Sequence, residues 1–192
     1  MGTLAPIAHN EHLYAPLRLP ASSMLFNPSA PVTIFNPRPQ VIDSTSNTSR
    51  TRREHDIRVL CVDDNPLIAE AFSVKLSRTP GFRWLGHLDS TIRLSEEVAE
   101  QAPDVVLLDV DIPGEDTFAA LQQLIRCTEC DVKVLMVSGH VRLDLIDRAV
   151  ESGAWGYISK SDPSDAIVDA IRRVHRGEFV MSEIVARAYQ QK

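Results

Sequence analysis

Short apolar runs alternate with longer amphipathic segments along residues 56–177. The apolar runs predict strands buried on both faces, as in a parallel sheet covered by helices. The amphipathic segments predict helices, because their apolar residues recur at helical spacing. The expected strands are 57–62, 82–87, 104–109, 132–137 and 155–158, and the expected helices are 66–78, 90–101, 117–127, 141–152 and 164–176.

This order of elements predicts an α/β fold. Five strands that alternate with five helices are typical of a doubly wound, five-stranded parallel sheet with right-handed crossovers, a flavodoxin-like arrangement of three layers. Asn65 followed by Pro66 indicates the start of the first helix, since Asn is a favoured N-cap and Pro a favoured first residue. We therefore expect one folded domain over residues 56–178 and a C-terminal helix or tail over 179–192.

Residues 1–55 have a different composition. Seven of the twelve prolines lie here, residues 44–51 are polar, and the scattered apolar residues keep neither strand nor helix period. Such a segment buries too little surface to offset its chain entropy. We expect a disordered Pro/Ser-rich N-terminal extension; the alternative is a short docking segment around 32–35.

Charge and cysteine content narrow the function classes. Residues 56–192 carry 15 basic and 23 acidic side chains, which argues against a nucleic-acid-binding surface on the folded domain. Three cysteines make no even disulfide framework, and the pair Cys127 and Cys130 lacks further zinc ligands at matching spacing. No signal peptide or run of ~18 apolar residues is present, so we expect a cytoplasmic protein with no membrane partner.

Polar and charged residues stand at the ends of four expected strands: Asp63 and Asp64 after the first, Asp109 at the end of the third, Ser138 after the fourth and Lys160 after the fifth. Carboxyl ends of parallel strands meet at the ligand-binding edge of such a sheet. Carboxylates that approach one another repel unless a cation joins them, and hard oxygen ligands suit Mg²⁺. The spacing therefore predicts a magnesium site next to a hydroxyl and an ammonium group.

The chemistry implied is attack by the Asp109 carboxylate on a phosphoryl donor, which gives an acyl phosphate. Lys160 can pair with Asp109 and then with a phosphoryl oxygen, while Ser138 can donate a hydrogen bond to another. We expect no turnover of a separate substrate, only self-catalysed phosphorylation and dephosphorylation.

At this point residues 57–177 resemble the receiver domain of two-component response regulators, which has the CheY-like fold. The matching residues are Asp63-Asp64, Asp109 with Pro113-Gly114, Ser138 with Gly139, and Lys160. The segments 153–160 and 171–177 look most like receivers that precede a LuxR-type helix-turn-helix output domain. Thr117 departs from the family, because it stands where a glycine is common in the loop after the site.

The resemblance assigns roles to these residues. Asp109 would be the phosphoacceptor, assisted by Lys160 and Ser138. Mg²⁺ would be held by Asp64, Asp109 and the backbone carbonyl of Asp111, and Asp63 would take part in the metal site through water or a metal ligand. Ser138 and Tyr157 would form the switch that follows phosphorylation, with Tyr157 turning inward. Asp111 and His140 would set the lifetime of the phosphoryl group.

The resemblance also implies partners in a phosphorelay. The donor would be a sensor histidine kinase or a phosphotransfer protein, and the output would be a protein or a homodimer contact through the 141–176 face, with no nucleic acid bound by this chain. The alternative is the receiver part of a truncated helix-turn-helix transcriptional regulator. A third reading, a haloacid-dehalogenase-like phosphatase, rests on Asp109-Val110-Asp111, but the acid pair precedes the nucleophile here instead of following the lysine.

Overall fold

The computed structural model describes residues 56–126 and 131–190. The strands are β1 (Ile57–Val62), β2 (Phe82–Leu88), β3 (Val105–Asp109), β4 (Lys133–Ser138), β5 (Gly156–Ser159) and β6 (Val180–Met181). The helices are α1 (Pro66–Ser77), α2 (Leu94–Gln101), α3 (Thr117–Arg126), α4 (Leu143–Glu151), α5 (Ser164–His175) and α6 (Glu183–Gln190). The expected N-terminal extension, its alternative docking segment and the pair Cys127 and Cys130 lie outside the described residues.

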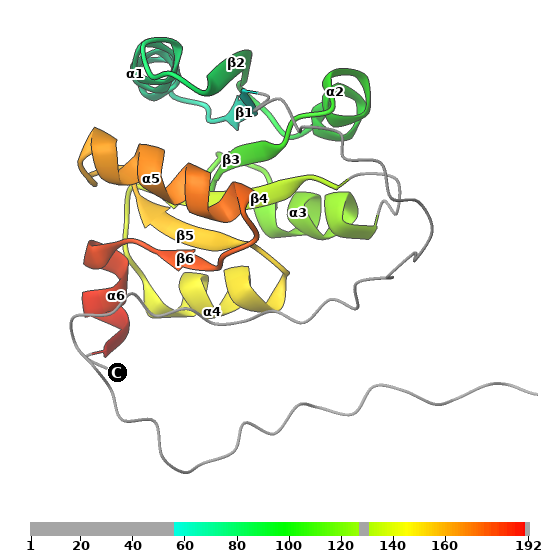
Figure 1. The fold of residues 1–192 in the computed structure, drawn as a ribbon. Helices are drawn as coiled ribbons and strands as arrows, with labels where there is room; N and C mark the ends of the chain where they lie inside the picture. The colour runs from blue at the N-terminus through cyan, green and yellow to red at the C-terminus, as the bar shows by residue number, and fades with distance from the viewer. Residues whose placement is uncertain (1–55, 127–130, 191–192) are drawn as a thin grey trace, which may run out of the picture. The chain divides into compact units, whose positions relative to one another are not determined.

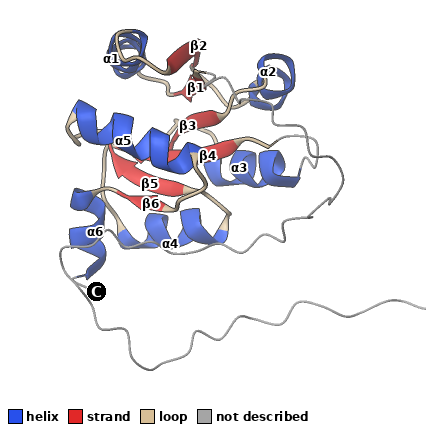
Figure 2. Ribbon diagram, in the orientation of Figure 1, coloured by secondary structure: helices blue, strands red, loops and turns tan. Residues whose placement is uncertain are grey.

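The strands form one parallel sheet in the order β2-β1-β3-β4-β5-β6. Figure 1 shows this order as a stack from β2 at the top to β6 at the bottom, and Figure 2 shows the helices around it. All five residues of β3 are buried, which explains its uninterrupted apolar sequence. The predicted doubly wound α/β fold is confirmed.

Helices cover both faces of the sheet, because alternate residues of each inner strand point to opposite sides. In β3, Val106 and Leu108 pack in a cluster with α2, α3, α4 and α6, whereas Val105 and Leu107 pack in a second cluster with α1 and α5. Cys61 belongs to the second cluster and is 1% exposed, so it packs as a small apolar side chain.

The predicted number of strands is wrong by one, whereas the C-terminal segment forms a helix, one of the two expected possibilities. The sheet has six strands, since β6 pairs in parallel with β5, and α6 follows it. A strand of two residues is too short to show a period in the sequence. Its place is set by burial instead: Phe179 is 6% exposed and Val180 is 2% exposed.

Local signals explain where the helices begin. The side chain of Asn65 caps α1 by accepting a hydrogen bond from the backbone N–H of Leu67 at 3.0 Å. Helix α2 begins later than expected, because the Ser90 hydroxyl accepts the N–H of Ile92 and Ile92 is 85% exposed. The longest described helices have 12 residues, whereas a membrane span needs about 20, and no described helix could cross a bilayer.

Candidate functional site

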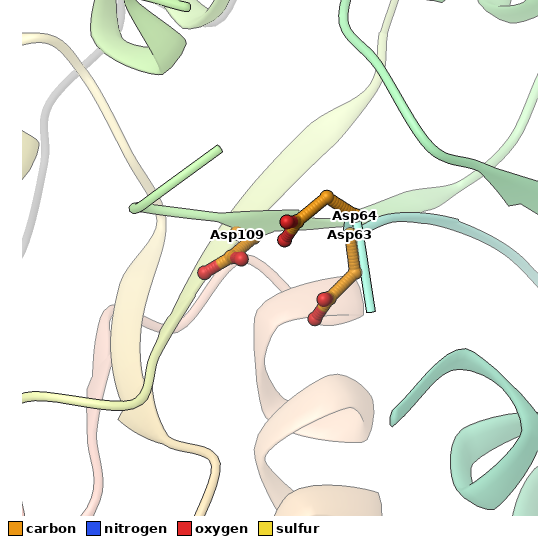
Figure 3. A group of neighbouring side chains, drawn as sticks. All are labelled: Asp63, Asp64 and Asp109. Carbon is orange, nitrogen blue, oxygen red and sulfur yellow. The ribbon is translucent and has the colours of Figure 1, made fainter. Parts of the chain in front are cut away.

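Three carboxylates meet where β1 and β3 leave the core. Asp63 and Asp64 follow β1, Asp109 is the last residue of β3, and the two strands are neighbours in the sheet. One carboxylate oxygen of each residue lies within 4.8 Å of the others. Figure 3 shows the three side chains as neighbours at the strand ends. Asp63 and Asp109 are buried, whereas Asp64 is exposed at the mouth of the site.

Lys160 joins the two buried carboxylates. Its Nζ lies 2.8 Å from Oδ2 of Asp63 and 2.8 Å from Oδ2 of Asp109. The side chains of Asp63 and Asp109 are 1% and 2% exposed, and that of Lys160 is 16% exposed. The lysine comes from the end of β5, where its N–H donates to the backbone carbonyl of Ser138 on β4. Two buried negative charges therefore share a single ammonium group.

The other carboxylate oxygens have backbone partners. Oδ1 of Asp63 accepts the N–H of Asn65 at 2.9 Å, and Oδ1 of Asp109 accepts the N–H of Asp111 at 3.3 Å. The long bond to Asp109 is weak by distance. Asp109 is therefore held firmly through Oδ2 and loosely through Oδ1, which leaves Oδ1 the more available oxygen.

The site shifts the pKa values of its own groups. Burial raises the pKa of Asp109; hydrogen bonding and charge from Lys160 oppose this, the Asp63 charge adds to it, and the net pKa is raised. Burial by itself would lower the pKa of Lys160, but its hydrogen bonds to Asp109 and Asp63 outweigh that effect and the pKa is raised. Lys160 is therefore charged at neutral pH.

We expect Asp109→Asn to stabilise the metal-free chain at pH 7. Because the folded pKa of Asp109 lies above its ordinary value of 3.8, the unfolded chain releases this proton first as pH rises. The free energy of unfolding then falls between the unfolded and the folded pKa of Asp109, and it stays lower at neutral pH. Asn does not ionise, so in EDTA its free energy of unfolding at pH 7 should exceed the wild-type value by more than the ~0.5 kcal/mol typical of surface changes.

The control for this prediction is Asp169→Asn, since Asp169 is exposed on α5. Denaturant unfolding at several pH values between 3 and 7 makes the comparison. The advantage of Asp109→Asn should shrink as pH falls through the folded pKa, and should vanish below 3.8, where both the folded and the unfolded chain bind the proton. A variant less stable than wild type at pH 7 would contradict the assigned direction of the pKa shift.

The donor set fits a hard divalent cation. Carboxylate oxygens are the ligands that Mg²⁺ prefers, and it retains several waters when bound by few carboxylates. Asp63 already bonds Lys160 and Asn65 through its two oxygens, so Asp64 and Asp109 offer the less engaged oxygens. The participation of the Asp111 carbonyl stays a prediction.

Ser138 and Tyr157 contact the loop between β4 and α4. The Ser138 hydroxyl donates to the carbonyl oxygen of His140 at 2.7 Å and accepts its N–H at 3.1 Å. The Tyr157 hydroxyl donates to the same carbonyl at 3.4 Å, and its ring is 0% exposed. Burial raises the pKa of Tyr157, a shift partly offset by Ser138. The ring, expected to turn inward upon phosphorylation, is thus already buried, while the side chain of His140 is exposed.

Thr117 fits its position without a glycine-like backbone. It is the first residue of α3, is 1% exposed, and its hydroxyl donates to the carbonyl of Val110 at 2.8 Å. Within the described residues, Ala102 is the one non-glycine residue with a positive φ, so Thr117 carries no such strain. The departure at this position exchanges a flexible residue for a buried hydrogen bond.

The contacts that fix the loop after Asp109 were not predicted from the sequence. Asp116 accepts the N–H of Ala119 at 3.1 Å and receives two hydrogen bonds of 2.9 Å from Arg148 of α4. The Arg148 guanidinium also lies 4.4 Å from the ring centre of Phe118. The cap spacing of Asp116 was visible in the sequence, but its partner on α4 was not, because that contact depends on tertiary packing.

A second acid fixes the other side of the same loop. Glu115 accepts the backbone N–H of Thr91 at 2.7 Å and its hydroxyl at 2.6 Å. The loop is therefore tied to the segment before α2 through Glu115 and to α4 through Asp116. The loop that follows Asp109 is thus in direct contact with α4, so a movement of this loop would act on α4.

Comparisons with known proteins agree with this geometry. The model of the response regulator receiver domain family matches residues 59–172. Response regulator GacA from Pseudomonas viridiflava is 34% identical over 131 residues, 68% of this chain and 61% of GacA. Response regulator UvrY from Escherichia coli K12 is 32% identical over 129 residues, 67% of this chain and 59% of UvrY. The chain therefore spans about three fifths of the length of these relatives.

A solved structure is similar as well. The crystal structure of a LuxR-family two-component response regulator from Aurantimonas sp. SI85-9A1 superposes with a TM-score of 0.65 at 25% identity. The superposition covers 70% of this chain and 95% of that protein. The haloacid-dehalogenase-like reading is not favoured, because the acid pair lies on β1, ahead of Asp109, within the matched family region. The chain belongs to the response regulator receiver family of two-component signalling proteins.

Proposed function

We propose that the chain accepts a phosphoryl group on the carboxylate of Asp109 and uses it to switch a protein-interaction face. The observation that carries this proposal is the position of the Lys160 ammonium, 2.8 Å from both Asp63 and Asp109 at the strand ends. The donor is a sensor histidine kinase or a phosphotransfer protein of the same relay. The receiver domain extends over residues 56–178, with an N-terminal extension before it and a C-terminal segment after it.

The reaction is a phosphoryl transfer between two side chains. A carboxylate oxygen of Asp109 attacks phosphorus, the new P–O bond forms, and the P–N bond of the donor phosphohistidine breaks, with the electron pair leaving on the imidazole nitrogen. Lys160 stays charged and pairs with a phosphoryl oxygen as charge moves away from the Asp109 carboxylate. Ser138 donates to a second phosphoryl oxygen once it leaves the His140 carbonyl.

A bound Mg²⁺ would neutralise charge on the phosphoryl oxygens, and Asp63, Asp64, Asp109 and the Asp111 carbonyl are its proposed ligands. The side chains of Asp111 and His140 are exposed near the mouth of the site. There they control the access of water to the acyl phosphate, and so its lifetime. Loss of the group by hydrolysis returns Asp109 to its carboxylate form.

The output is a protein contact through the 141–176 face, which contains α4, β5 and α5. The hydrogen bonds between Asp116 and Arg148 connect the loop after Asp109 with this face, and Ser138 and Tyr157 connect the site with the loop before α4. Because one similar solved structure is that of a LuxR-family regulator, and the chain covers only 61% of its relative GacA, the alternative is that this face controls a helix-turn-helix domain. The protein acts in the cytoplasm, where its phosphoryl donors are.

The test is phosphorylation by acetyl phosphate, followed by intact mass in Mg²⁺ and in EDTA. We expect one phosphoryl adduct with Mg²⁺ and none with EDTA. At limiting Mg²⁺, Asp64→Asn should slow adduct formation on the order of tenfold or more, since even outer-shell changes cost 10–100-fold in metal affinity. Higher Mg²⁺ should restore part of the rate.

The matched control is Asp89→Asn, an exposed acid that follows β2. It should leave the Mg²⁺ dependence unchanged. Equal adduct formation in Mg²⁺ and in EDTA would refute the metal requirement, and turnover of a small phosphate ester without a stable adduct would refute the signalling role.

A further inference from the structure

The C-terminal segment, residues 178–190, adds a strand and a helix to the edge of the sheet next to Tyr157. Strand β6 pairs in parallel with β5, with Gly156 opposite Val180 and Tyr157 opposite Met181. The N–H of Ser182 donates to the carbonyl of Tyr157 at 3.2 Å. The backbone of the segment is therefore bonded directly to the residue proposed as the switch.

Gly156 shows that β5 is shaped for this segment. A Cβ atom at this position would lie 2.5 Å from the carbonyl oxygen of Val180 and 2.8 Å from the side chain of Leu135. Real Cβ atoms do not approach a backbone oxygen so closely, so the glycine permits the close approach of β6. The sequence of β5 thus favours docking of the C-terminal segment, because Gly156 leaves room for it.

Helix α6 packs on the same face of the sheet as Tyr157. Val185 is 0% exposed and belongs to the apolar cluster that contains Tyr157 and Ile146 of α4, and Met181 and Tyr189 pack against that cluster. The Tyr189 hydroxyl donates to Oδ1 of Asp147 on α4 at 2.8 Å. Figure 1 shows α6, in red, after β6 at the end of the chain.

These contacts determine whether the C-terminal segment is ordered and whether the Tyr157 ring is buried. A helix of 8 residues and a strand of two are marginal in isolation, so their order depends on docking to β5 and α4. In return, β5 is not an edge strand and the Tyr157 ring has no exposed surface. Since docking and ring burial share one cluster, each must favour the other.

We propose that the C-terminal segment holds Tyr157 in its buried position before any phosphoryl group is present. The same segment occupies the β5 part of the 141–176 face, so a partner that binds β5 must displace it. The role of Tyr157 as a switch rests on the proposed function, whereas its retention by the segment does not. The occupant of this part of the face is thus residues 178–190 of the chain itself.

The test uses the unphosphorylated full-length chain with fluorotyrosine in place of tyrosine. Tyr14→Phe leaves two labelled rings, Tyr157 and Tyr189. Val185→Ser removes the buried anchor of α6, and Ile184→Ser is the matched control, because Ile184 is 41% exposed on the same helix. Amide exchange reports on docking of α6, and the fluorine resonance of Tyr157 reports on its ring.

With Val185→Ser we expect amides of residues 183–190 to exchange at least about tenfold faster, equivalent to about 1.4 kcal/mol of lost docking. The Tyr157 resonance should move toward the position of a solvent-exposed ring. Ile184→Ser should change neither quantity. Amides of β1 and β3 should keep wild-type exchange, which shows that the fold is intact.

Tyr189→Phe is the second variant, since it removes only the hydroxyl that bonds Asp147 and leaves Tyr157 as the single labelled ring. Faster exchange of α6 with an unmoved Tyr157 resonance, in either variant, would overturn the proposal. Unchanged exchange of α6 in both variants would also overturn it. Because no phosphorylation is involved, failure here leaves the proposed function of Asp109 untouched, and failure of phosphorylation leaves this result standing.

Discussion

Lys160→Met should disable the site and destabilise the fold together. The substitution leaves Asp63 and Asp109 buried without their shared ammonium, and breaking a buried pair by removal of one partner is strongly destabilising. We expect the free energy of unfolding to fall by about 2–3 kcal/mol at pH 7, below the full value for a buried pair because Lys160 is 16% exposed. Denaturant unfolding without metal measures it.

Phosphorylation of the same variant by acetyl phosphate should be slower by about a hundredfold, the usual result of removing a group that stabilises developing negative charge. Lys75→Met is the control, since Lys75 pairs with an exposed Asp165 and should lose less than about 1 kcal/mol. If Lys160→Met and Lys75→Met lowered the free energy of unfolding equally, a group other than Lys160 would be neutralising the buried charges of Asp63 and Asp109. If Lys160→Met were phosphorylated at the wild-type rate, Lys160 would not act on the phosphoryl group.

Tyr157→Ala should be among the most destabilising single changes in the chain. The ring is 0% exposed and is one of the largest fully buried side chains, and deletion of a buried aromatic ring costs about 3–5 kcal/mol. Tyr157→Phe keeps the ring and removes only a hydroxyl at 3.4 Å from its acceptor, so it should lose less than about 1.5 kcal/mol. Chemical denaturation of both variants provides the comparison.

Comparison of Tyr157→Ala with Tyr157→Phe tests whether the Tyr157 ring is buried or exposed to solvent. A loss below about 1 kcal/mol for Tyr157→Ala would mean that the ring is largely outside the core in solution. Such a result would contradict the arrangement in which Tyr157 contacts the His140 carbonyl. It would also remove the ring from the cluster it shares with α6.

The central strands and the site were predictable from the sequence because one physical rule produces both. A strand buried on both faces must be apolar until it leaves the core, so the first carboxylate after it marks the edge of the sheet. That rule places Asp63 and Asp109 on neighbouring strands, and the parallel order brings Lys160 to the same edge. The structure brings these three side chains within hydrogen-bonding distance.

Other features were not predictable because they depend on tertiary packing. Strand β6 has two residues and exists because β5 offers backbone partners and Gly156 leaves space for it. The Arg148 contact with Asp116 joins α4 to the loop before α3, and no local sequence pattern encodes the relative placement of these two segments. The buried position of Tyr157 in the phosphate-free chain depends on the same additional strand and helix.

The buried charges of the site reduce the stability of the folded domain. Burial and, to a smaller extent, the charge of Asp63 raise the pKa of Asp109, and one lysine offsets both charges. In the proposed mechanism, a cation and a phosphoryl group change the balance of charge at the strand ends, and the contact of Asp116 with Arg148 passes that change to α4. We expect this unfavourable burial of a charged carboxylate to make the proposed switch responsive.

The most direct test of this account is the position of the phosphoryl group. Wild-type protein treated with acetyl phosphate and Mg²⁺ is reduced with borohydride, which converts an aspartyl phosphate to homoserine and releases phosphate. Peptide mass spectrometry then locates the homoserine. We expect homoserine at residue 109 alone, and none in Asp109→Asn. Homoserine at residue 63 or 64, or a phosphoryl adduct that persists in Asp109→Asn, would contradict it.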